Sequence, residues 1–338
     1  MKNYLVILLL LSIVSCENQE IVFDDFDYTT AYFPYQYPVR TLVLGDYIYD
    51  NSNDNNHKFL ISAAMGGVYE NPKDRELKIE IDESLCEDVL FSPSEDTIRV
   101  MPSNYYSLSS SETILIPKGK VNGSIEVQLT EAFFEDSLAI KLGYVIPVRI
   151  IGSTDVDSIL QGKSDFSNPD PRMAESWTIL PKDFTMFAVK YINPYHGNYL
   201  HKGVSVVADA SGDEVETTIY SEKFITRNEI WSLITESRNE VAVEGIIRSS
   251  YISGSIKMIL SFSSDGNCVV REASDSDFVI SGSGKFMQNT EEWGNKKRNA
   301  IYLNYSLSND VYTYNAVDTL VIRDRNVVME LYNPLLKE

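Results

Sequence analysis

The feature that most constrains the fold is a long series of short runs in which apolar and polar residues alternate. The runs begin near residue 29 and continue almost to the C-terminus, and Asn, Asp, Gly, Pro and Ser fill the gaps between them. Alternation with a period of two places apolar side chains on one face of a half-buried β-strand. The chain also contains 21 Tyr and 14 Phe, which favour pleated surfaces. We therefore predict an all-β protein.

The first group of runs predicts a β-sandwich over residues 29–155. Several short strands at this spacing, separated by turn residues, are typical of that architecture. Residues 156–174 lose the alternation, and their prolines disfavour helix, so we interpret them as a linker. The expected strands are 31–33, 40–44, 58–64, 77–81, 97–100, 113–116, 124–129 and 144–151.

The second group of runs predicts a barrel over residues 175–338. A long succession of strands needs its edges closed, and an antiparallel up-and-down β-barrel of the calycin or lipocalin type closes them. A barrel-like sandwich is the alternative. Residues 229–235 follow a helix-capping pattern, yet Trp231, Leu233 and Thr235 alternate, so we predict a strand there. The expected strands are 187–192, 199–208, 214–220, 229–235, 241–246, 255–262, 268–271, 278–286, 300–307, 319–323 and 327–332.

The N-terminus has the features of an export signal. Lys2 is the only charged residue before Cys16, and the apolar run from Tyr4 to Val14 is eleven residues long. Such a run spans roughly 16 Å as a helix, about half of a bilayer core, so a spanning helix is not expected. The sequence Ile13-Val14-Ser15-Cys16 resembles the lipobox of bacterial lipoproteins. That resemblance implies a signal peptide at residues 1–15 and acylation of Cys16; an ordinary signal peptide with a chance cysteine is the alternative.

The charge of the chain excludes some classes of binding partner. The formal net charge is −20, which argues against nucleic acid and against electrostatic adhesion to anionic lipid. Membrane contact is therefore expected only through the lipid on Cys16. The tether that would follow, residues 16–28, is acidic and resembles the export tags of Bacteroidetes surface lipoproteins. This implies an outer-membrane lipoprotein that faces the cell exterior, with the periplasmic face as the alternative.

Three segments carry a resemblance to a known family. They are AYFPYQYPVRTLVLG from residue 31, YHGNYLHKG at 195–203 and EEWGNKKRNAIYLNY at 291–305. With the lipobox they resemble surface lipoproteins encoded in Bacteroidetes polysaccharide-utilisation systems. The resemblance implies an Ig-like N-terminal domain of unknown function, followed by an uncharacterised barrel-like domain. It also implies that this protein is encoded and acts together with glycan importers and hydrolases.

No motif in the sequence specifies catalysis. A G-x-S-x-G elbow, a P-loop and a dinucleotide fingerprint are all absent, and 49 acidic residues would form carboxylate pairs by chance. His196 and His201 are five residues apart, so they would face opposite sides of one strand. We expect a tight turn at Gly197 and His201 near an exposed strand end. No catalytic residue, metal site or cofactor is predicted.

The candidate ligand-binding residues surround a tryptophan. Trp293 lies beside the densest basic cluster of this acidic chain, which consists of Lys296, Lys297 and Arg298. An exposed aromatic ring can stack on the C–H face of a sugar while polar neighbours bind the hydroxyl groups. Tyr195, beside Gly197, is a further candidate. The alternative for Trp293 is a plug at a barrel end, with an arginine stacked over the ring.

Together these features predict a non-enzymatic, lipid-anchored cell-surface protein that binds a polysaccharide or oligosaccharide, or that assists a glycan-uptake complex. The first alternative is a structural or protein-interaction subunit that docks onto an outer-membrane transporter or enzyme. A glycosidase is the second alternative.

Overall fold

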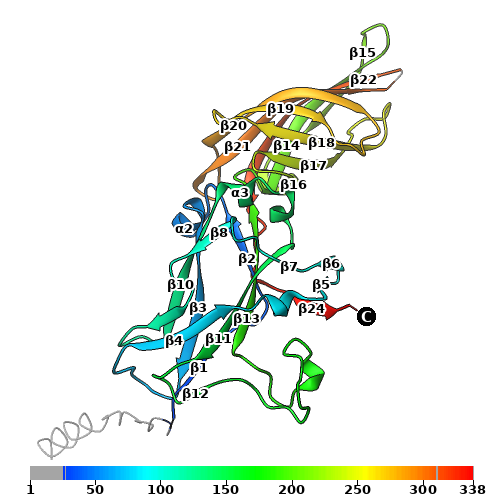
Figure 1. The fold of residues 1–338 in the computed structure, drawn as a ribbon. Helices are drawn as coiled ribbons and strands as arrows, with labels where there is room; N and C mark the ends of the chain where they lie inside the picture. Colours follow the sequence, from blue (N-terminus) through cyan, green and yellow to red (C-terminus); the bar gives the residue numbers. More distant parts are fainter. Residues whose placement is uncertain (1–25, 27, 310, 338) are drawn as a thin grey trace, which may run out of the picture.

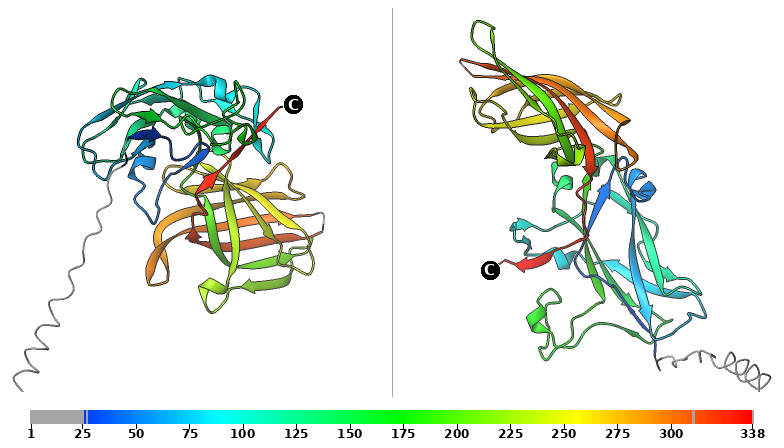
Figure 2. Two further views of the ribbon diagram at one scale, coloured as in Figure 1. Left: turned by 90° about the horizontal axis from the view of Figure 1, so that it is seen from below. Right: turned by 180° about the vertical axis from the view of Figure 1, so that it is seen from behind.

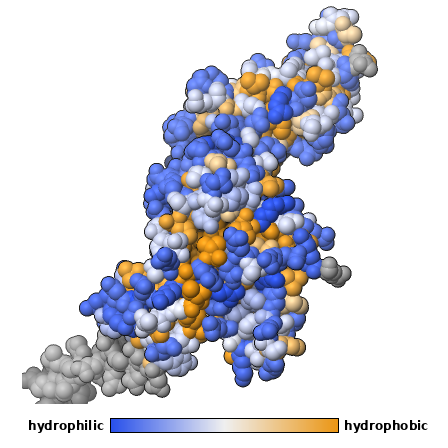
Figure 3. Space-filling model, in the orientation of Figure 1, coloured by the Kyte–Doolittle hydropathy of each residue, from blue (hydrophilic) through white to orange (hydrophobic). Residues whose placement is uncertain are grey.

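The computed structural model describes residues 26, 28–309 and 311–337, and it consists of a β-sandwich and a β-barrel joined end to end (Figure 1). The all-β prediction is confirmed. Cys16, the predicted signal peptide and most of the predicted tether lie outside the described residues. Within the described residues, no helix is both long enough and apolar enough to span a membrane. In the view of Figure 3, a group of apolar residues lies over the sandwich.

Two sheets form the sandwich and enclose its core. The first has the order β12 (Ser158–Ile159), β1 (Thr30–Tyr32), β3 (Lys58–Gly66), β10 (Asn122–Leu129) and β8 (Tyr106–Leu108). The second has the order β23 (Glu330–Leu331), β2 (Pro38–Val43), β13 (Phe184–Ile192), β11 (Tyr144–Gly152), β4 (Arg75–Ile81) and β9 (Thr113–Ile116), and β7 (Arg99–Val100) also pairs with β11. Inward-facing side chains of both sheets, such as Ile61, Ile125 and Ile146, are buried between them. This is the packing that alternating strands require.

Short elements complete the sandwich. A small sheet joins β24 (Asn333–Leu336), β5 (Val89–Ser92) and β6 (Asp96–Thr97). The α-helices are α2 (Ser52–Asn55) and α3 (Glu131–Phe134), and single 3₁₀ turns cover Glu83–Cys86, Ser137–Ile140, Ala174–Ser176 and Ile225–Arg227. Cys86 is a free thiol buried here, and Cys268 is a free thiol buried in the barrel. Burial raises the pKa of both thiols to about 12.

The boundary between the two domains differs from the predicted one. Strand β13 pairs in parallel with β2 and antiparallel with β11, so Phe184–Ile192 lies in the middle of a sandwich sheet. The predicted linker also folds onto the sandwich, because β12 pairs with β1 and Arg172 donates hydrogen bonds to the carbonyls of Leu85 and Glu87. The sandwich therefore extends to Ile192, and the barrel begins after Asn193, not at residue 175.

The second domain is a closed barrel of eight antiparallel strands. Its last strand returns to its first, with Asn198 opposite Asp324 and Ala208 opposite Thr313. The sheet closes on itself, as predicted. Residues 229–235 form a strand, which confirms that prediction. The strands are β14 (Gly197–Ala208), β16 (Glu229–Thr235), β17 (Glu240–Ile246), β18 (Ser255–Phe262), β19 (Asn267–Glu272), β20 (Val279–Trp293), β21 (Lys296–Ser308) and β22 (Thr313–Asp324), and β15 (Glu214–Tyr220) pairs with the distal half of β14.

A buried polar group lies among the apolar side chains of the barrel interior. The Asp318 carboxylate is fully enclosed and accepts hydrogen bonds from the hydroxyls of Tyr220 and Tyr305. His201 Nε2 lies 3.0 Å from Asp318 Oδ2, and the His201 ring stacks on Trp231 with 3.8 Å between centroids. His201 is therefore buried, and the prediction of an exposed position was wrong. In the alternation of β14, His201 lies on the face of the strand that points into the barrel.

Two glycines make room for this interior. A Cβ on Gly203 would lie 2.2 Å from Asp318 Oδ1, and one on Gly245 would lie 2.4 Å from the Trp231 ring. Neither distance is compatible with van der Waals contact, so both positions require the smallest residue.

Two segments of the chain connect the sandwich to the barrel. The first runs from β13 through Asn193 into β14, and the second leaves β22 at Asp324 and returns to β23 beside β2. Figure 2 shows this returning segment and the C-terminal strand lying against the sandwich. At the same junction, Arg238 of the barrel forms an ion pair with Glu131 of α3 and lies over the Phe134 ring.

Candidate functional site

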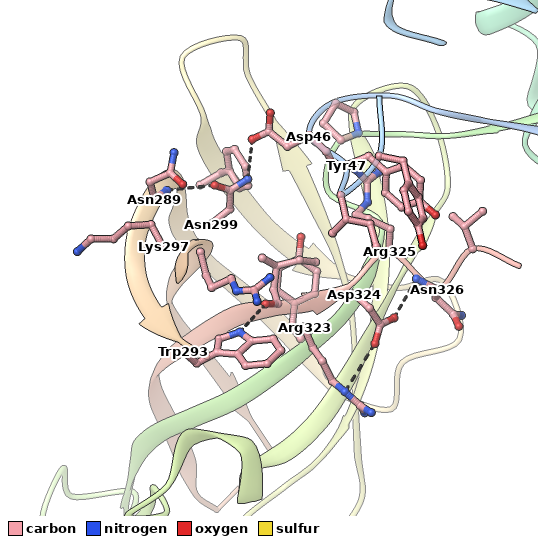
Figure 4. A pocket seen from close by; sticks show the side chains of 18 of the residues that line it. Asp46, Tyr47, Asn289, Trp293, Lys297, Asn299, Arg323, Asp324, Arg325 and Asn326 are labelled. Carbon is pink, nitrogen blue, oxygen red and sulfur yellow. Dashed lines mark hydrogen bonds and ion pairs between the residues drawn. The ribbon is translucent and has the colours of Figure 1, made fainter. Parts of the chain in front are cut away.

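A cleft of about 800 Å³ lies at the junction of the two domains. Its walls are the loop between β2 and α2, the extended β20–β21 hairpin, and the segment that follows β22. Figure 4 shows the hairpin side chains of Asn289, Trp293 and Lys297 on one side, and Asp46 and Tyr47 on the other. The lining residues are Asp46, Tyr47, Ile48, Tyr49, Pro194, Tyr199, Phe286, Asn289, Trp293, Lys297, Arg298, Asn299, Ile322, Arg323, Asp324, Arg325, Asn326, Val327 and Val328.

Strands β20 and β21 extend further than the sequence predicted, and this extra length brings their hairpin to the cleft. The register shifts between Met287 and Glu291, which re-aims the hairpin beyond the barrel. At the tip, Gly294 and Asn295 both have positive φ, as a two-residue type I′ turn requires. Glu291 accepts hydrogen bonds from Lys202 Nζ at 3.0 Å and the Tyr302 hydroxyl at 3.1 Å. These contacts fix the hairpin against the outside of the barrel.

Trp293 lies on the outer surface of the barrel. Its indole packs against an outward-facing apolar cluster of Leu200, Ala300 and Val321, and its Nε1 donates to the Ile322 carbonyl at 3.0 Å. The Arg298 guanidinium lies over the ring, 4.1 Å from its centroid. The arginine stacking proposed as an alternative is therefore present, but on the outside of the barrel and not as a plug. With the barrel below and Arg298 above, the indole forms a wall of the cleft and carries the guanidinium.

The basic residues of the hairpin separate into two groups. Lys297 and Arg298 line the cleft, whereas Lys296 does not. Lys297 Nζ lies 3.7 Å from Glu292 Oε2, and both side chains are exposed. Among the described residues, Arg298 has no ion-pair partner, and its buried Nε has no hydrogen-bond acceptor.

Tyr195 closes the end of the barrel that faces the sandwich. Its ring stacks on Phe262 with 3.7 Å between centroids and meets the edge of Phe286 at 5.1 Å. Burial raises the pKa of its hydroxyl. Tyr195 is thus the barrel plug, the position considered as the alternative for Trp293, and it lies outside the cleft lining although it was predicted to contact a ligand.

Sequence reasoning missed the aromatic residues on the sandwich side of the cleft. Tyr47 and Tyr49 meet edge to face at 5.5 Å, and Tyr49 is 68% exposed. A second groove of about 580 Å³ adjoins the cleft, shares both rings, and continues along the sandwich to Asp54. The available signal was their position in a loop, between Gly45 and the Asn-rich segment that begins at Asp50.

Polar contacts join the two walls. Asp46 Oδ2 accepts a hydrogen bond from Asn299 Nδ2 at 2.9 Å, and Asn299 Oδ1 accepts one from the backbone amide of Asn289 at 3.0 Å. The Asn299 side-chain amide is thus held at the cleft edge, where it can present donors and acceptors to a ligand.

Arg325 lies at the base of the cleft and bonds both domains. It is only 7% exposed. Its guanidinium donates to the carbonyls of Leu44, Asp46, Asn193 and His196, at distances from 2.6 to 3.0 Å. Burial lowers its pKa, since the charged form loses hydration. One side chain thereby holds the β2–α2 loop, the domain junction and the start of the barrel together.

His196, beside this junction, has a structural role. The backbone amide of Thr235 donates to His196 Nδ1 at 3.1 Å, which requires that nitrogen to be unprotonated. Burial, and then the charge of Arg325, lower the His196 pKa to about 4. Within the described residues, no group of three or more His, Cys, Asp or Glu side chains could hold a metal ion.

Comparison with known proteins identifies both domains. A family model described as a domain of unknown function, DUF5627, matches residues 194–326, and a model of an N-terminal domain matches residues 26–157. A crystal structure of a protein of unknown function from Bacteroides ovatus is 38% identical, with a TM-score of 0.86; the match covers 92% of this chain and 100% of that one. The chain belongs to the same family as this protein. The DUF5627 match corresponds to the barrel with its Arg325 contacts, in agreement with a domain boundary at Asn193.

More distant structures share less with this two-domain protein. A multidomain Bacteroides ovatus protein that includes DUF1735 is 12% identical with a TM-score of 0.44, covering 89% of this chain and 97% of that one. An auxiliary nutrient binding protein from Bacteroides thetaiotaomicron is 13% identical with a TM-score of 0.39, covering 84% and 90%. No curated protein matches the chain.

Proposed function

We propose that this DUF5627 protein is a non-enzymatic, lipid-anchored protein of the cell surface that holds glycan in its interdomain cleft. The observation that carries the proposal is the composition of the cleft, which combines the exposed ring of Tyr49 and the partly exposed ring of Tyr47 with amide, carboxylate and guanidinium groups. A pyranose ring presents weakly positive C–H groups that stack on the negative face of an aromatic ring. Its hydroxyl groups need donors and acceptors of the kind that Asn289, Asn299 and Asp46 provide.

The open stacking surface is on the sandwich side. The Trp293 ring packs on the barrel and carries Arg298, whereas Tyr49 is largely exposed. A sugar ring would therefore stack on Tyr49 and contact the hairpin with its polar edge. The second groove continues past the same tyrosine, so a chain of several sugar units could occupy both. Weak contacts at each unit would add along such a chain.

Replacement of Tyr49 tests the stacking surface. We expect Tyr49→Ala to weaken binding of the glycan about tenfold, because a lost ring contact costs about 1.4 kcal/mol. Isothermal titration against a panel of plant, host and microbial polysaccharides measures this. Tyr251→Ala is the matched control, since Tyr251 is an exposed ring outside the cleft. If no member of the panel bound the unchanged protein, or if both variants bound it equally well, the proposed site would be wrong.

Replacement of Cys16 tests the anchor. We expect Cys16→Ser to abolish incorporation of labelled palmitate and to move the protein from the membrane fraction to the soluble fraction, because stable anchoring needs more than one acyl chain on that residue. Protease added to intact cells then distinguishes the exterior face from the periplasmic one. Continued labelling of the variant would contradict acylation at this position.

A second candidate function is supported by apolar side chains next to the cleft. Ile48, Val328 and Met329 are each 66–75% exposed, and they lie together along the two adjoining grooves. Such a surface is typical of a protein-interaction site, which fits a subunit that docks onto an outer-membrane transporter or enzyme. A stable protein partner on co-purification, with no affinity for sugar, would favour this function. Release of reducing sugar that is lost in Asp46→Asn or Asp324→Asn would instead indicate a glycosidase.

A further inference from the structure

The cleft is positively charged although the chain is strongly acidic. Four cationic and two acidic side chains line it, in a protein with a formal net charge of −20. Both acids already accept hydrogen bonds from neutral amides: Asp46 from Asn299, and Asp324 from Asn198 at 2.8 Å. The two acids balance only two of the four positive charges, so the side chains that line the cleft keep a net charge of +2.

Arg298 is the cation best placed to meet a ligand. It is held over the Trp293 ring, 4.1 Å from the ring centroid, and among the described residues it forms no ion pair. A planar guanidinium presents parallel N–H donors that match the two oxygens of a carboxylate, or of a sulfate, better than a lysine does. Stacking on the indole reduces the side-chain freedom that binding would otherwise remove.

Arg325 adds a second positive charge beneath the cleft. The hydrogen bonds of its guanidinium go to backbone carbonyls, and within the described part of the chain no carboxylate forms an ion pair with it. A charge in a buried site acts at longer range than one in water. An anion in the cleft would gain from this potential, whereas a second cation would be repelled.

The two remaining cations are exposed and only loosely paired. Lys297 approaches Glu292 only to 3.7 Å and Arg323 approaches Asp324 only to 3.6 Å, and these side chains are 64% and 47% exposed. Such exposed pairs contribute little and are exchanged at small cost.

We propose that the glycan held in the cleft is acidic, and that its carboxylate or sulfate group binds Arg298, with Lys297 and Arg323 as flanking cations. The inference rests on the proposed function and names the substrate class of the same site. A sugar ring would stack on Tyr49 while its charged substituent contacts the opposite wall.

Matched ligands separate this inference from the proposed function. The unchanged protein would be titrated with oligogalacturonates, with the same oligosaccharides methyl-esterified, and with a sulfated and an unsulfated form of one neutral glycan. We expect the charged member of at least one pair to bind ten times or more tightly than its uncharged partner, and to weaken as salt is raised. The pair that shows the difference identifies carboxylate or sulfate. Equal binding of charged and uncharged members would overturn the acidic specificity and leave the glycan site standing, whereas no binding to these ligands or to the neutral panel would overturn both.

A charge-removing variant locates the anion. Arg298→Gln should lose tenfold or more in affinity for the acidic ligand while its affinity for the uncharged partner changes less than threefold. Lys285→Gln, which removes the same charge from the exposed outer face of β20, should match the unchanged protein toward both. Equal losses toward both ligands in Arg298→Gln would indicate a disturbed cleft wall and would overturn the assignment to Arg298. Thermal unfolding of each variant shows whether the fold is retained.

Discussion

Arg325→Ala is expected to destabilise the protein by about 3–4 kcal/mol. The substitution removes the donors of four carbonyl groups, three of which belong to the buried residues Leu44, Asn193 and His196. A buried carbonyl that loses its partner costs about 1 kcal/mol or more. Because these groups belong to both domains, we also expect the barrel and the sandwich to unfold in separate transitions. Denaturant titration followed by circular dichroism and by tryptophan fluorescence would detect both effects.

Two variants make this expectation specific. Arg325→Lys should recover little of the loss, since one ammonium on a flexible stem cannot satisfy carbonyls that a planar fork reaches on several sides. Arg323→Ala, two residues earlier and half exposed, should change the free energy of unfolding by less than about 1 kcal/mol. A single unshifted transition in Arg325→Ala would show that the domain junction does not depend on this residue.

Asp318→Ala is expected to cost about 3–5 kcal/mol through the barrel alone. The carboxylate is enclosed, and its removal leaves the hydroxyls of Tyr220 and Tyr305 without their acceptor and takes away the charge that lies 3.0 Å from His201 Nε2. Removal of one partner from a buried polar interaction has effects of this size. Burial and the Asp318 charge raise the Tyr305 pKa far above its usual range, so the hydroxyl stays a donor at every accessible pH. Chemical denaturation monitored by tryptophan fluorescence reports on Trp231, which stacks on His201.

A double-mutant cycle would isolate the contact. Tyr220→Phe alone removes one donor, and the double variant Asp318→Ala with Tyr220→Phe should be less destabilised than the sum of the singles by about 0.5–3 kcal/mol. Asp324→Ala, an exposed carboxylate on the same strand, should cost less than about 1 kcal/mol. Strict additivity of Asp318 and Tyr220 would contradict a shared hydrogen bond.

Local patterns predicted the strands well but could not assign all of them to a sheet. Tyr199–Ala208 and Val241–Ile246 fall within strands of the closed barrel because alternation marks which face of a strand is buried. Strand β13 was recognised in part, yet its parallel partner β2 lies far away in sequence, and pairing over such distances leaves no local trace. Proline-rich composition at residues 168–171 indicated a loop correctly. It did not reveal that Arg172 would anchor the loop to the sandwich.

The candidate site was predictable in residue type more than in geometry. The basic cluster beside Trp293 is visible in sequence, and the structure places Lys297 and Arg298 in the cleft. Whether a tryptophan ring is open depends on what covers each face, here the barrel wall and Arg298, and neither contact is encoded in spacing. Tyr49 was missed because the β2–α2 loop meets the barrel only after both domains have folded. Tyr195 was misjudged because a residue next to a turn can still point into a core.

The two connections between the domains have a mechanical consequence. A single linker would let the barrel rotate relative to the sandwich. Here two segments cross between the domains, one at Asn193 and one at Arg325, and the Arg325 guanidinium bonds both of them. Rotation of one domain against the other would shear those bonds. The width of the cleft should therefore be the same with and without a bound ligand. Binding would then occur without domain closure.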